Sequence, residues 1–256
     1  MTRTISNHRS SKSRLSWAVA AIIFLWLSLA RAQDASVSGQ IEIQETGAKY
    51  PADSTHHGNA ASNPVVWLVP LSVMPESLSA QRPRTPAQLV QRNKSFEPHV
   101  LVVQVGTTVQ FPNKDPFFHN VFSLFDGKRF DLGLYEAGSS NSVRFDRPGI
   151  SFLFCNIHPE MSAVIIAVPT PFFAVTDAQG RWTIPNVPDG RYHLHVWYER
   201  SSEDMLAKTQ SEVTVSDAGR SLPAIRIAAD AAPNPAHKNK YGKDYVPPSS
   251  PAYSNP

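Results

Sequence analysis

Three residues near the middle of the chain carry side chains that bind soft metals. Cys155, His158 and Met161 follow one another at intervals of three in the sequence CNIHPEM, so one short loop can turn all three toward the same point. Sulfur ligands combined with imidazole select copper, and two histidines, a cysteine and a weak axial methionine form a blue-copper site. The pattern therefore predicts a copper site that needs one more histidine.

We expect the missing ligand from a neighbouring strand, and His119 is the candidate. It follows TTVQFPNKDPFF and begins the apolar run HNVFS, where a loop joins a strand. The predicted order is one early histidine and then, 36 residues later, the cluster that begins at Cys155.

The elements that must position these residues are β-strands. After the first 32 residues the chain has no long stretch of helical period, but many short runs rich in Val, Ile, Phe and Tyr between turn-forming clusters. The 22 prolines also favour short strands over helices, and Gly106 is expected to supply a tight turn. We predict an all-β fold with strands at 37–44, 65–70, 89–94, 100–105, 107–111, 121–124, 141–145, 151–156, 163–168, 172–176, 181–185, 191–198, 211–215 and 222–227.

Residues 86–169 resemble the cupredoxin family. The likeness rests on FEPHVLVVQVGTTVQFPNKDPFFHNVFS and FDRPGISFLFCNIHPEMSAVIIAV, and the CxxHxxM spacing is similar to that of amicyanin. The resemblance implies a Greek-key β-sandwich that binds one mononuclear type 1 copper. It also implies the roles of the site residues. His119, Cys155 and His158 would be the equatorial ligands and Met161 the axial ligand. Asn120 would be the amide that braces the ligand loop.

The same resemblance implies a protein partner. In cupredoxins an apolar collar around the more exposed histidine docks redox partners, and Pro116, Phe117 and Phe118 would form it here, near His158. We therefore expect a redox partner protein whose identity is open. The loop departs from amicyanin at residues 156–157. This chain has Asn and Ile there, whereas amicyanin has a proline before the histidine, so the reduction potential of amicyanin cannot be carried over.

The flanking segments, residues 33–75 and 170–228, resemble a carboxypeptidase regulatory-like domain, a transthyretin-like β-sandwich. TDAQGRWTIPNVPDGRYHLHVW looks like its second half, and VSGQI with VVWLVP like its first. Since two lone strands are marginally stable, the early ones must pair with later ones, and the cupredoxin domain would be an insertion. This arrangement is often labelled methylamine-utilisation-like. Residues 229–256 are rich in proline and predict a disordered tail.

The first 32 residues predict export. Residues 1–14 carry four basic and no acidic residues, and residues 15–30 are apolar apart from two serines. This apolar run is shorter than the roughly 20 residues that span a bilayer, and Ala30-Arg31-Ala32 has the pattern of a signal peptidase site. We expect cleavage after Ala32 and a bacterial periplasmic or secreted protein without stable membrane insertion. The alternative is an uncleaved membrane anchor.

Cleavage would also change the charge balance. Removing five of 24 Lys and Arg and none of 21 Asp and Glu leaves 19 basic against 21 acidic residues, so the mature chain is nearly neutral and nucleic acid is not an expected partner. Exported proteins normally pair their cysteines, whereas Cys155 is alone. A metal that holds its sulfur as thiolate would explain this.

Other chemistry has weaker support. The chain lacks GxSxG, Walker and GxGxxG motifs, which favours electron transfer over catalysis. His193 and His195 lie on one side of a predicted strand and could hold a metal. The alternation along this strand turns Tyr192, Leu194 and Val196 inward, so we expect the two histidines to face solvent. Two alternatives stay open: a copper carrier or sensor, and a structural sandwich with a vestigial site.

Overall fold

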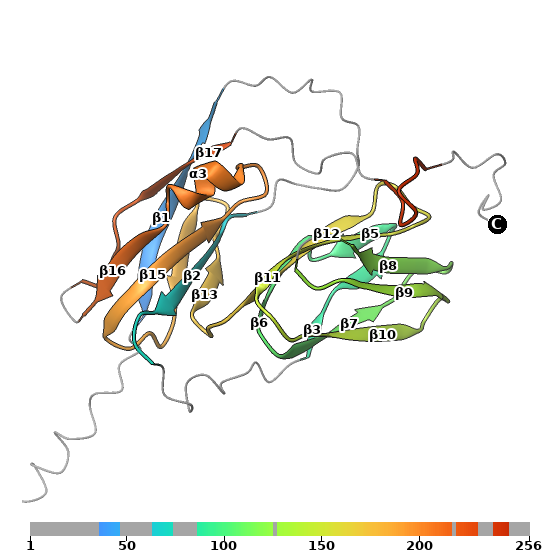
Figure 1. The fold of residues 1–256 in the computed structure, drawn as a ribbon, viewed down its shortest axis with the longest axis horizontal. Coiled ribbons are helices and arrows are strands. Elements are labelled where there is room, and N and C mark those ends of the chain that lie inside the picture. Colours follow the sequence, from blue (N-terminus) through green and yellow to red (C-terminus); the bar gives the residue numbers. More distant parts are fainter. Residues whose placement is uncertain are drawn as a thin grey trace, which may run out of the picture. The chain divides into compact units, whose positions relative to one another are not determined.

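The computed structural model describes residues 36–46, 63–73, 86–124, 127–216, 219–229 and 238–245. Every regular element of these residues except one short helix is a strand (Figure 1), so the predicted all-β class is confirmed. The predicted signal segment at residues 1–32 lies outside the described residues. Within the described ranges no helix has both the length and the apolarity needed to cross a membrane.

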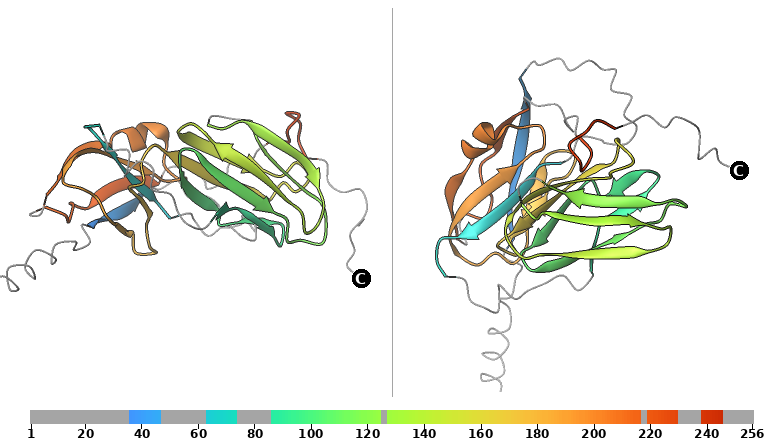
Figure 2. Two further views of the ribbon diagram at one scale, coloured as in Figure 1. Left: turned by 90° about the horizontal axis from the view of Figure 1, so that it is seen from below. Right: turned by 45° about the vertical axis from the view of Figure 1, so that its right-hand side comes forward.

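Ten consecutive strands form the part that we call the central sandwich (Figure 2). They are β3 (Ala87–Gln88), β4 (Val90–Arg92), β5 (Ser95–Glu97), β6 (Val100–Gln104), β7 (Thr107–Pro112), β8 (His119–Ser123), β9 (Phe130–Tyr135), β10 (Ser140–Phe145), β11 (Gly149–Phe154) and β12 (Ser162–Val168). One sheet has the order β10-β7-β3 and the other β6-β12-β11-β8-β9, while β4 and β5 form a hairpin. The two sheets share one apolar core, to which Val109, Phe111, Val121 and Leu153 belong.

The remaining strands form the part that we call the terminal sandwich. They are β1 (Val37–Glu45), β2 (Val65–Pro70), β13 (Phe173–Val175), β14 (Arg181–Ile184), β15 (Gly190–Trp197), β16 (Ser211–Val215) and β17 (Ile225–Ala229), with the short helix α3 (Glu203–Ala207) before β16. The sheets have the orders β14-β1-β17 and β13-β2-β15-β16. Strands that precede the central sandwich in the chain and strands that follow it therefore share both sheets.

Strand β12 is buried on both of its faces. All seven of its residues are buried, and successive side chains of a strand point to opposite sides. Ala163, Ile165 and Ala167 belong to the core of the central sandwich, whereas Val164 and Ile166 belong to a cluster with residues of the terminal sandwich. This double burial explains why the strand is a continuous apolar run rather than an alternating one.

Several parts of the central sandwich differ from the predicted strands, and β3 is one that was not predicted. The strand predicted at 89–94 corresponds to β4 and the turn after it, because Asn93 and Lys94 both have φ 53° and form the two-residue turn that leads to β5. Strand β9 was not predicted, since it contains Gly133, which has φ 67°. The predicted turn at Gly106, with φ 89°, is confirmed.

Gly180 closes the turn between β13 and β14, and we expect Gly180→Ala to destabilise the fold. Its φ is +75°, and a Cβ atom there would lie 2.1 Å from the carbonyl oxygen of Ile41 in β1. Alanine therefore adds a steric clash to the left-handed penalty of about 1–2 kcal/mol. The measurement is the midpoint of denaturant unfolding.

Gly138→Ala is the matched control for this prediction. Gly138 has φ +77°, but no heavy atom lies within 4 Å of a Cβ placed there, so alanine meets only the conformational penalty. Equal losses of stability in the two variants would contradict the predicted clash at Gly180.

Candidate metal centre

The ligand loop, residues 155–161, joins two neighbouring antiparallel strands. Strand β11 ends at Phe154 and β12 begins at Ser162, and these two residues are paired with each other. Phe154 is also paired with Phe122 of β8, and β8 begins at His119. Regular strand pairing therefore brings the first histidine and both ends of the ligand loop together.

Three of the four predicted ligands converge on one point. The Nδ1 atoms of His119 and His158 lie 3.1 Å apart, and the Sγ atom of Cys155 lies 3.5 Å from Nδ1 of His158 and 3.9 Å from Nδ1 of His119. Among the described residues these three form the single group of at least three His, Cys, Asp or Glu whose ligand atoms cluster in this way.

The spacing of these atoms fits a shared metal ion. Metal bonds of about 2.0 Å to imidazole nitrogen and about 2.3 Å to thiolate sulfur, at near-tetrahedral angles, place the two nitrogens about 3.3 Å apart and nitrogen and sulfur about 3.5 Å apart. The observed nitrogen separation of 3.1 Å and the two nitrogen–sulfur separations of 3.5 and 3.9 Å lie within about 0.4 Å of these values. The donor set, two imidazoles and one thiol, is one that copper favours.

Met161, the predicted axial ligand, is fully buried at the end of the same loop. Its carbonyl oxygen accepts a hydrogen bond from the backbone N–H of Cys155, and its own N–H donates to the carbonyl oxygen of His158, at 3.2 and 3.1 Å. Its side chain belongs to the same core cluster as Cys155. The backbone of the loop is thus closed upon itself around the three predicted ligands that it contains.

Burial determines the protonation of the cluster. Cys155 and His119 are fully buried and His158 is half-buried. Burial raises the pKa of the Cys155 thiol, while the backbone N–H groups of Asn120, Ile157 and His158 act in the opposite direction and would stabilise a thiolate. Burial also lowers the pKa of both histidines, so that near neutral pH they are uncharged, which is the form that binds metals.

We expect His158 in the metal-free protein to titrate with a pKa of about 4. Desolvation by burial and the neighbouring His119 lower it from the ordinary 6.5. Because the unfolded chain binds this proton more readily, acidification from about pH 6.5 toward pH 4 should destabilise the folded metal-free protein. NMR titration of the imidazole measures the pKa, the denaturant-unfolded chain is the control, and a folded value near 6.5 would contradict the prediction.

Asp115 fixes the orientation of His119. Its Oδ2 atom lies 2.8 Å from Nε2 of His119, and its two carboxylate oxygens accept the N–H groups of Asn93 and Lys94 at 2.6 and 2.9 Å. Burial alone would raise the pKa of Asp115, but the backbone N–H of Lys94, the side chain of His119 and the N–H of Asn93 outweigh it and lower the pKa. An ionised Asp115 accepts a hydrogen bond from Nε2–H of His119, which leaves the lone pair of Nδ1 directed at the cluster.

Asn120 lies beside the cluster, but its side chain contacts β9. The side-chain amide donates to Oδ1 of Asp131 at 2.7 Å and to the carbonyl oxygen of Gly133 at 2.9 Å. The backbone N–H of Asn120 is the group that reaches the sulfur of Cys155. The side chain therefore connects this end of β8 to β9, and the backbone N–H is the group of Asn120 that reaches the ligand loop.

The predicted apolar collar surrounds the histidines in part. The ring of Phe117 lies 5.2 Å from that of His119 and 5.6 Å from that of His158, centroid to centroid. Pro116 and Phe118 are exposed, the latter to 50%. Phe117 thus covers the cluster, and its two neighbours face solvent.

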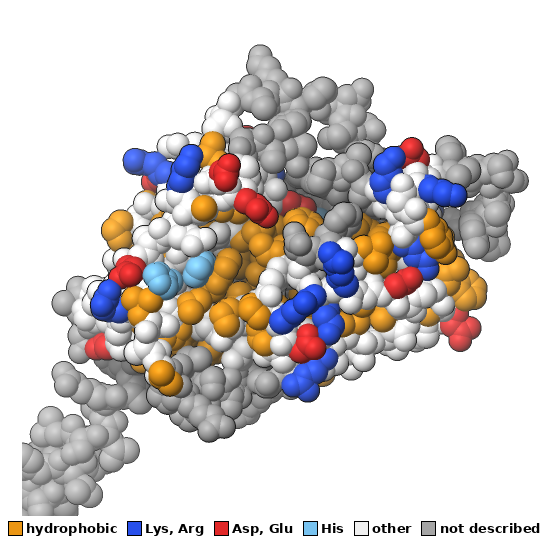
Figure 3. All heavy atoms as spheres, viewed as in Figure 1, with side chains coloured by type: hydrophobic (Ala, Val, Ile, Leu, Met, Phe, Trp, Pro, Cys, Tyr) orange, Lys and Arg blue, Asp and Glu red, His pale blue; other side chains and the backbone are white. Residues whose placement is uncertain are grey.

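The remaining histidines of the described chain lie apart from this cluster. The predicted inward orientation of Tyr192, Leu194 and Val196 is confirmed by their burial, and His193 is exposed while His195 stacks on Trp67 at 5.1 Å. Histidine side chains lie side by side on the surface shown in Figure 3.

His99 makes other contacts. Its Nε2 atom lies 2.8 Å from Oε2 of Glu199, and its Nδ1 atom lies 3.2 Å from the carbonyl oxygen of Ser162. It therefore connects the start of β12 to the residues after β15, and contributes no atom to the cluster.

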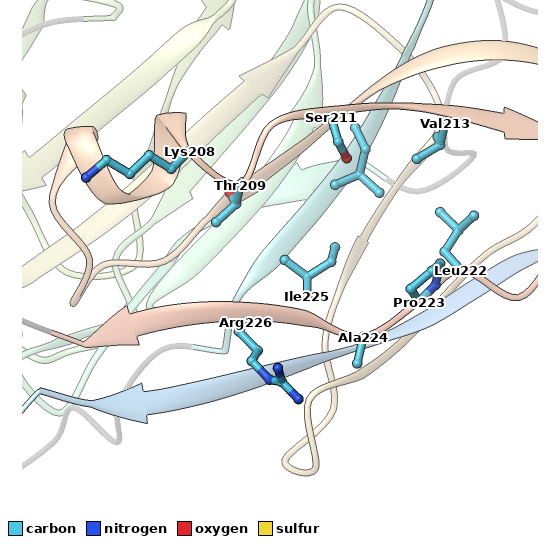
Figure 4. A pocket seen from close by; sticks show the side chains of 10 residues that line it. Lys208, Thr209, Ser211, Val213, Leu222, Pro223, Ala224, Ile225 and Arg226 are labelled. Carbon is cyan, nitrogen blue, oxygen red and sulfur yellow. The ribbon is translucent and has the colours of Figure 1, made fainter.

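A pocket of the terminal sandwich has a different character. It holds about 310 Å³ between β16 and β17, with Lys208 at one end and Arg226 among its lining residues (Figure 4). Leu194, Val213, Leu222 and Ile225 make the lining largely apolar. None of the predicted ligands lines it.

Comparison of the sequence with protein families gives one match in the terminal sandwich. Residues 171–222, which include β13 to β16, match the family described as Polysaccharide lyase family 4, domain II. This family differs from the carboxypeptidase regulatory-like family that we expected there, and that expectation is corrected accordingly. No curated protein sequence matches the chain.

Solved structures similar to the chain include copper proteins. A purple cupredoxin from Nitrosopumilus maritimus is 24% identical over 32% of this chain and 99% of its own, with a TM-score of 0.30. A copper-containing nitrite reductase from Thermus scotoductus is 28% identical over 39% of this chain and 25% of its own, with a TM-score of 0.32. A reduced amicyanin variant is 20% identical over 35% of this chain and 89% of its own, with a TM-score of 0.31. At such TM-scores these likenesses establish neither a metal nor an activity, and the chain spans only a quarter of the reductase.

Proposed function

We propose that this protein transfers single electrons through one mononuclear type 1 copper ion. The observation that carries the proposal is the convergence of Nδ1 of His119, Nδ1 of His158 and Sγ of Cys155, with separations between 3.1 and 3.9 Å. Two imidazoles and one thiolate form the trigonal part of such a site, and Met161 follows in the same loop as the weak fourth ligand.

Copper in this environment would supply reversible one-electron chemistry. The contribution of the chain is to hold the ligands in one arrangement, and three features support this role: strand pairing sets both ends of the ligand loop, the backbone of the loop is closed by its own hydrogen bonds, and Asp115 fixes the ring of His119. Ligands that are held by packing and hydrogen bonds change little in position when the metal changes its oxidation state.

The half-buried His158 is the proposed point of electron entry. His119 has no exposed surface, whereas His158 does, and Ile157 and Phe118 nearby are 42% and 50% exposed. We propose that an unidentified redox protein docks there, against Pro116, Phe117 and Phe118. The protein would act as a carrier of electrons and not as a catalyst.

The proposed location is the bacterial periplasm or the exterior of the cell. Its support is the predicted signal sequence in residues 1–32. An oxidising compartment is also compatible with a single cysteine, provided that a metal occupies the sulfur.

Spectroscopy of the purified protein with Cu(II) tests the proposal. We expect one equivalent of copper, an intense visible thiolate-to-copper charge-transfer band, a narrow parallel hyperfine splitting in the electron paramagnetic resonance spectrum, and full recovery of the band after reduction by ascorbate and reoxidation by ferricyanide. Tight binding of Cu(I) without a visible Cu(II) band would instead identify a copper carrier. Failure to bind either ion would identify a vestigial site.

A further inference from the structure

A segment near the C-terminus lies against the ligand loop. We call residues 238–245, the red segment in Figures 1 and 2, the C-terminal strap. The hydroxyl of Tyr245 donates a hydrogen bond of 2.7 Å to the carbonyl oxygen of Cys155, and the backbone N–H of Lys240 donates one of 3.0 Å to Oδ1 of Asn156. Two successive residues of the ligand loop are thus bonded to the strap, one of them the predicted sulfur ligand.

The strap has a folded structure of its own. The side-chain oxygen of Asn239 accepts the N–H groups of Tyr241 and Lys243, at 2.9 and 3.1 Å, and its backbone N–H donates to the carbonyl oxygen of Lys243 at 2.9 Å. These bonds form a compact turn, at which Gly242 takes the left-handed φ of 73°. The turn encloses Lys240 and ends at Lys243, two residues before Tyr245, so it limits the separation between the two anchoring residues.

A third anchor connects the strap to the other side of the metal centre. The Nζ atom of Lys240 lies 2.8 Å from Oδ2 of Asp131 in β9, while Oδ1 of the same carboxylate accepts the side-chain amide of Asn120. Asn120 in turn directs its backbone N–H to the sulfur of Cys155. The strap therefore reaches Cys155 by two routes, directly through the carbonyl oxygen of that residue and indirectly through Asp131 and Asn120.

We propose that the C-terminal strap fastens the ligand loop and that Tyr245 is a positioning residue for Cys155. With Tyr245 and Lys240 in place, the loop keeps the geometry that brings the three ligand atoms together, and release of the strap lets the loop open. The effect on copper rests on the proposed function, whereas the fastening itself is a property of the metal-free chain.

Hydrogen exchange of the metal-free, full-length protein tests the fastening. The backbone N–H groups of Cys155 and Met161 are bonded inside the loop and report its opening. We expect Tyr245→Phe to speed their exchange by about two- to tenfold, the factor that corresponds to the loss of one net hydrogen bond. Unchanged exchange in this variant would overturn the proposal.

Tyr241→Phe is the matched control, since it removes a hydroxyl from the same strap. Tyr241 is 70% exposed, donates its backbone N–H to Asn239, and places its ring 5.3 Å from Nζ of Lys240, a contact that a phenylalanine ring keeps. We expect the exchange of the Cys155 and Met161 amides in this variant to equal that of the wild type. An equal acceleration in both variants would mean that the hydroxyl of Tyr245 has no specific role, and would also overturn the proposal.

The copper-loaded protein supplies a second readout that a purely structural role would not change. We expect Tyr245→Phe to shift the energy of the thiolate-to-copper band and to release copper to a chelator about two- to tenfold faster, with Tyr241→Phe again like the wild type. If the band is absent in every form while exchange still responds to Tyr245→Phe, the proposed function fails and the fastening stands. A changed exchange rate with an unshifted band and unchanged copper release would overturn the positioning role.

Discussion

A Cys155→Ser variant is expected to lose the intense visible absorption of the copper-loaded protein, by about tenfold or more, because a serine oxygen cannot provide the thiolate from which charge transfer to copper arises. The imidazoles of His119 and His158 stay 3.1 Å apart at their Nδ1 atoms and can still hold Cu(II) weakly. The measurement is the absorption spectrum at equal copper and protein concentration.

Ser123→Ala is the control for this substitution. Ser123 is fully buried at the other end of β8, so its replacement perturbs the same strand without a change of ligand. We expect it to keep the visible band. A Cys155→Ser variant that keeps the band, with an unfolding midpoint equal to that of the wild type, would contradict the type 1 assignment.

Replacement of Asp115 is expected to weaken copper binding by about 10- to 100-fold, the usual effect of removing a group that orients a metal-binding histidine. Asp115→Asn keeps the size of the side chain but presents an uncharged amide to Nε2 of His119. The imidazole then loses its carboxylate partner, and Nδ1 is no longer fixed as the unprotonated nitrogen. A competition titration with a chelator measures the affinity, and nitrogen NMR of His119 reports the tautomer.

Asp146→Asn is the matched control for Asp115→Asn. The carboxylate of Asp146 is also paired, with Nζ of Lys128 at 3.0 Å, but it is 55% exposed and contacts no predicted ligand. We expect its copper affinity to equal that of the wild type. An unchanged affinity and tautomer in Asp115→Asn would show that the imidazole of His119 is oriented by packing alone.

Local sequence pattern was sufficient for most of the fold. The predicted strands at 65–70 and 211–215 coincide with β2 and β16, since short runs of branched apolar residues between turn clusters are reliable strand signals. Strand β9 was missed because FDLGLY contains Gly133 and Asp131 and adjoins a register shift opposite residues 120–122, which interrupts the alternation. The hairpin after β3 was missed because Asn93 and Lys94 lack a glycine to mark their positive φ angles.

The candidate site was predictable where its residues are neighbours in sequence. Cys155, His158 and Met161 lie in one loop, and spacing alone suggested their grouping. Asp115 has a weaker local signal, a carboxylate four residues before His119, and its importance depends on the Asn93–Lys94 turn, which lies more than 20 residues away in the chain.

The contacts of the C-terminal strap had no sequence signal at all. Residues 238–245 belong to the segment that was predicted to be disordered from its composition, and they are bonded to the ligand loop. Tyr245 donates to a backbone carbonyl group, and every residue carries such a group, so no particular side chain in the loop indicates the partner. The rest of the predicted tail, beyond β17 and these residues, lies outside the described residues.

The division of the terminal sandwich between two distant parts of the chain has a consequence for its folding. Strand β2 ends at Pro70 and its partner β13 begins at Phe173, so pairing them closes a loop of about 100 residues. The strands of the central sandwich follow one another directly in the chain, so that sandwich can fold before this loop closes. Once folded, the central sandwich holds its own first and last strands at a fixed separation and so lowers the entropy cost of joining β2 to β13. We therefore expect the central sandwich, which carries the metal centre, to fold first and to help bring the strands of the terminal sandwich together.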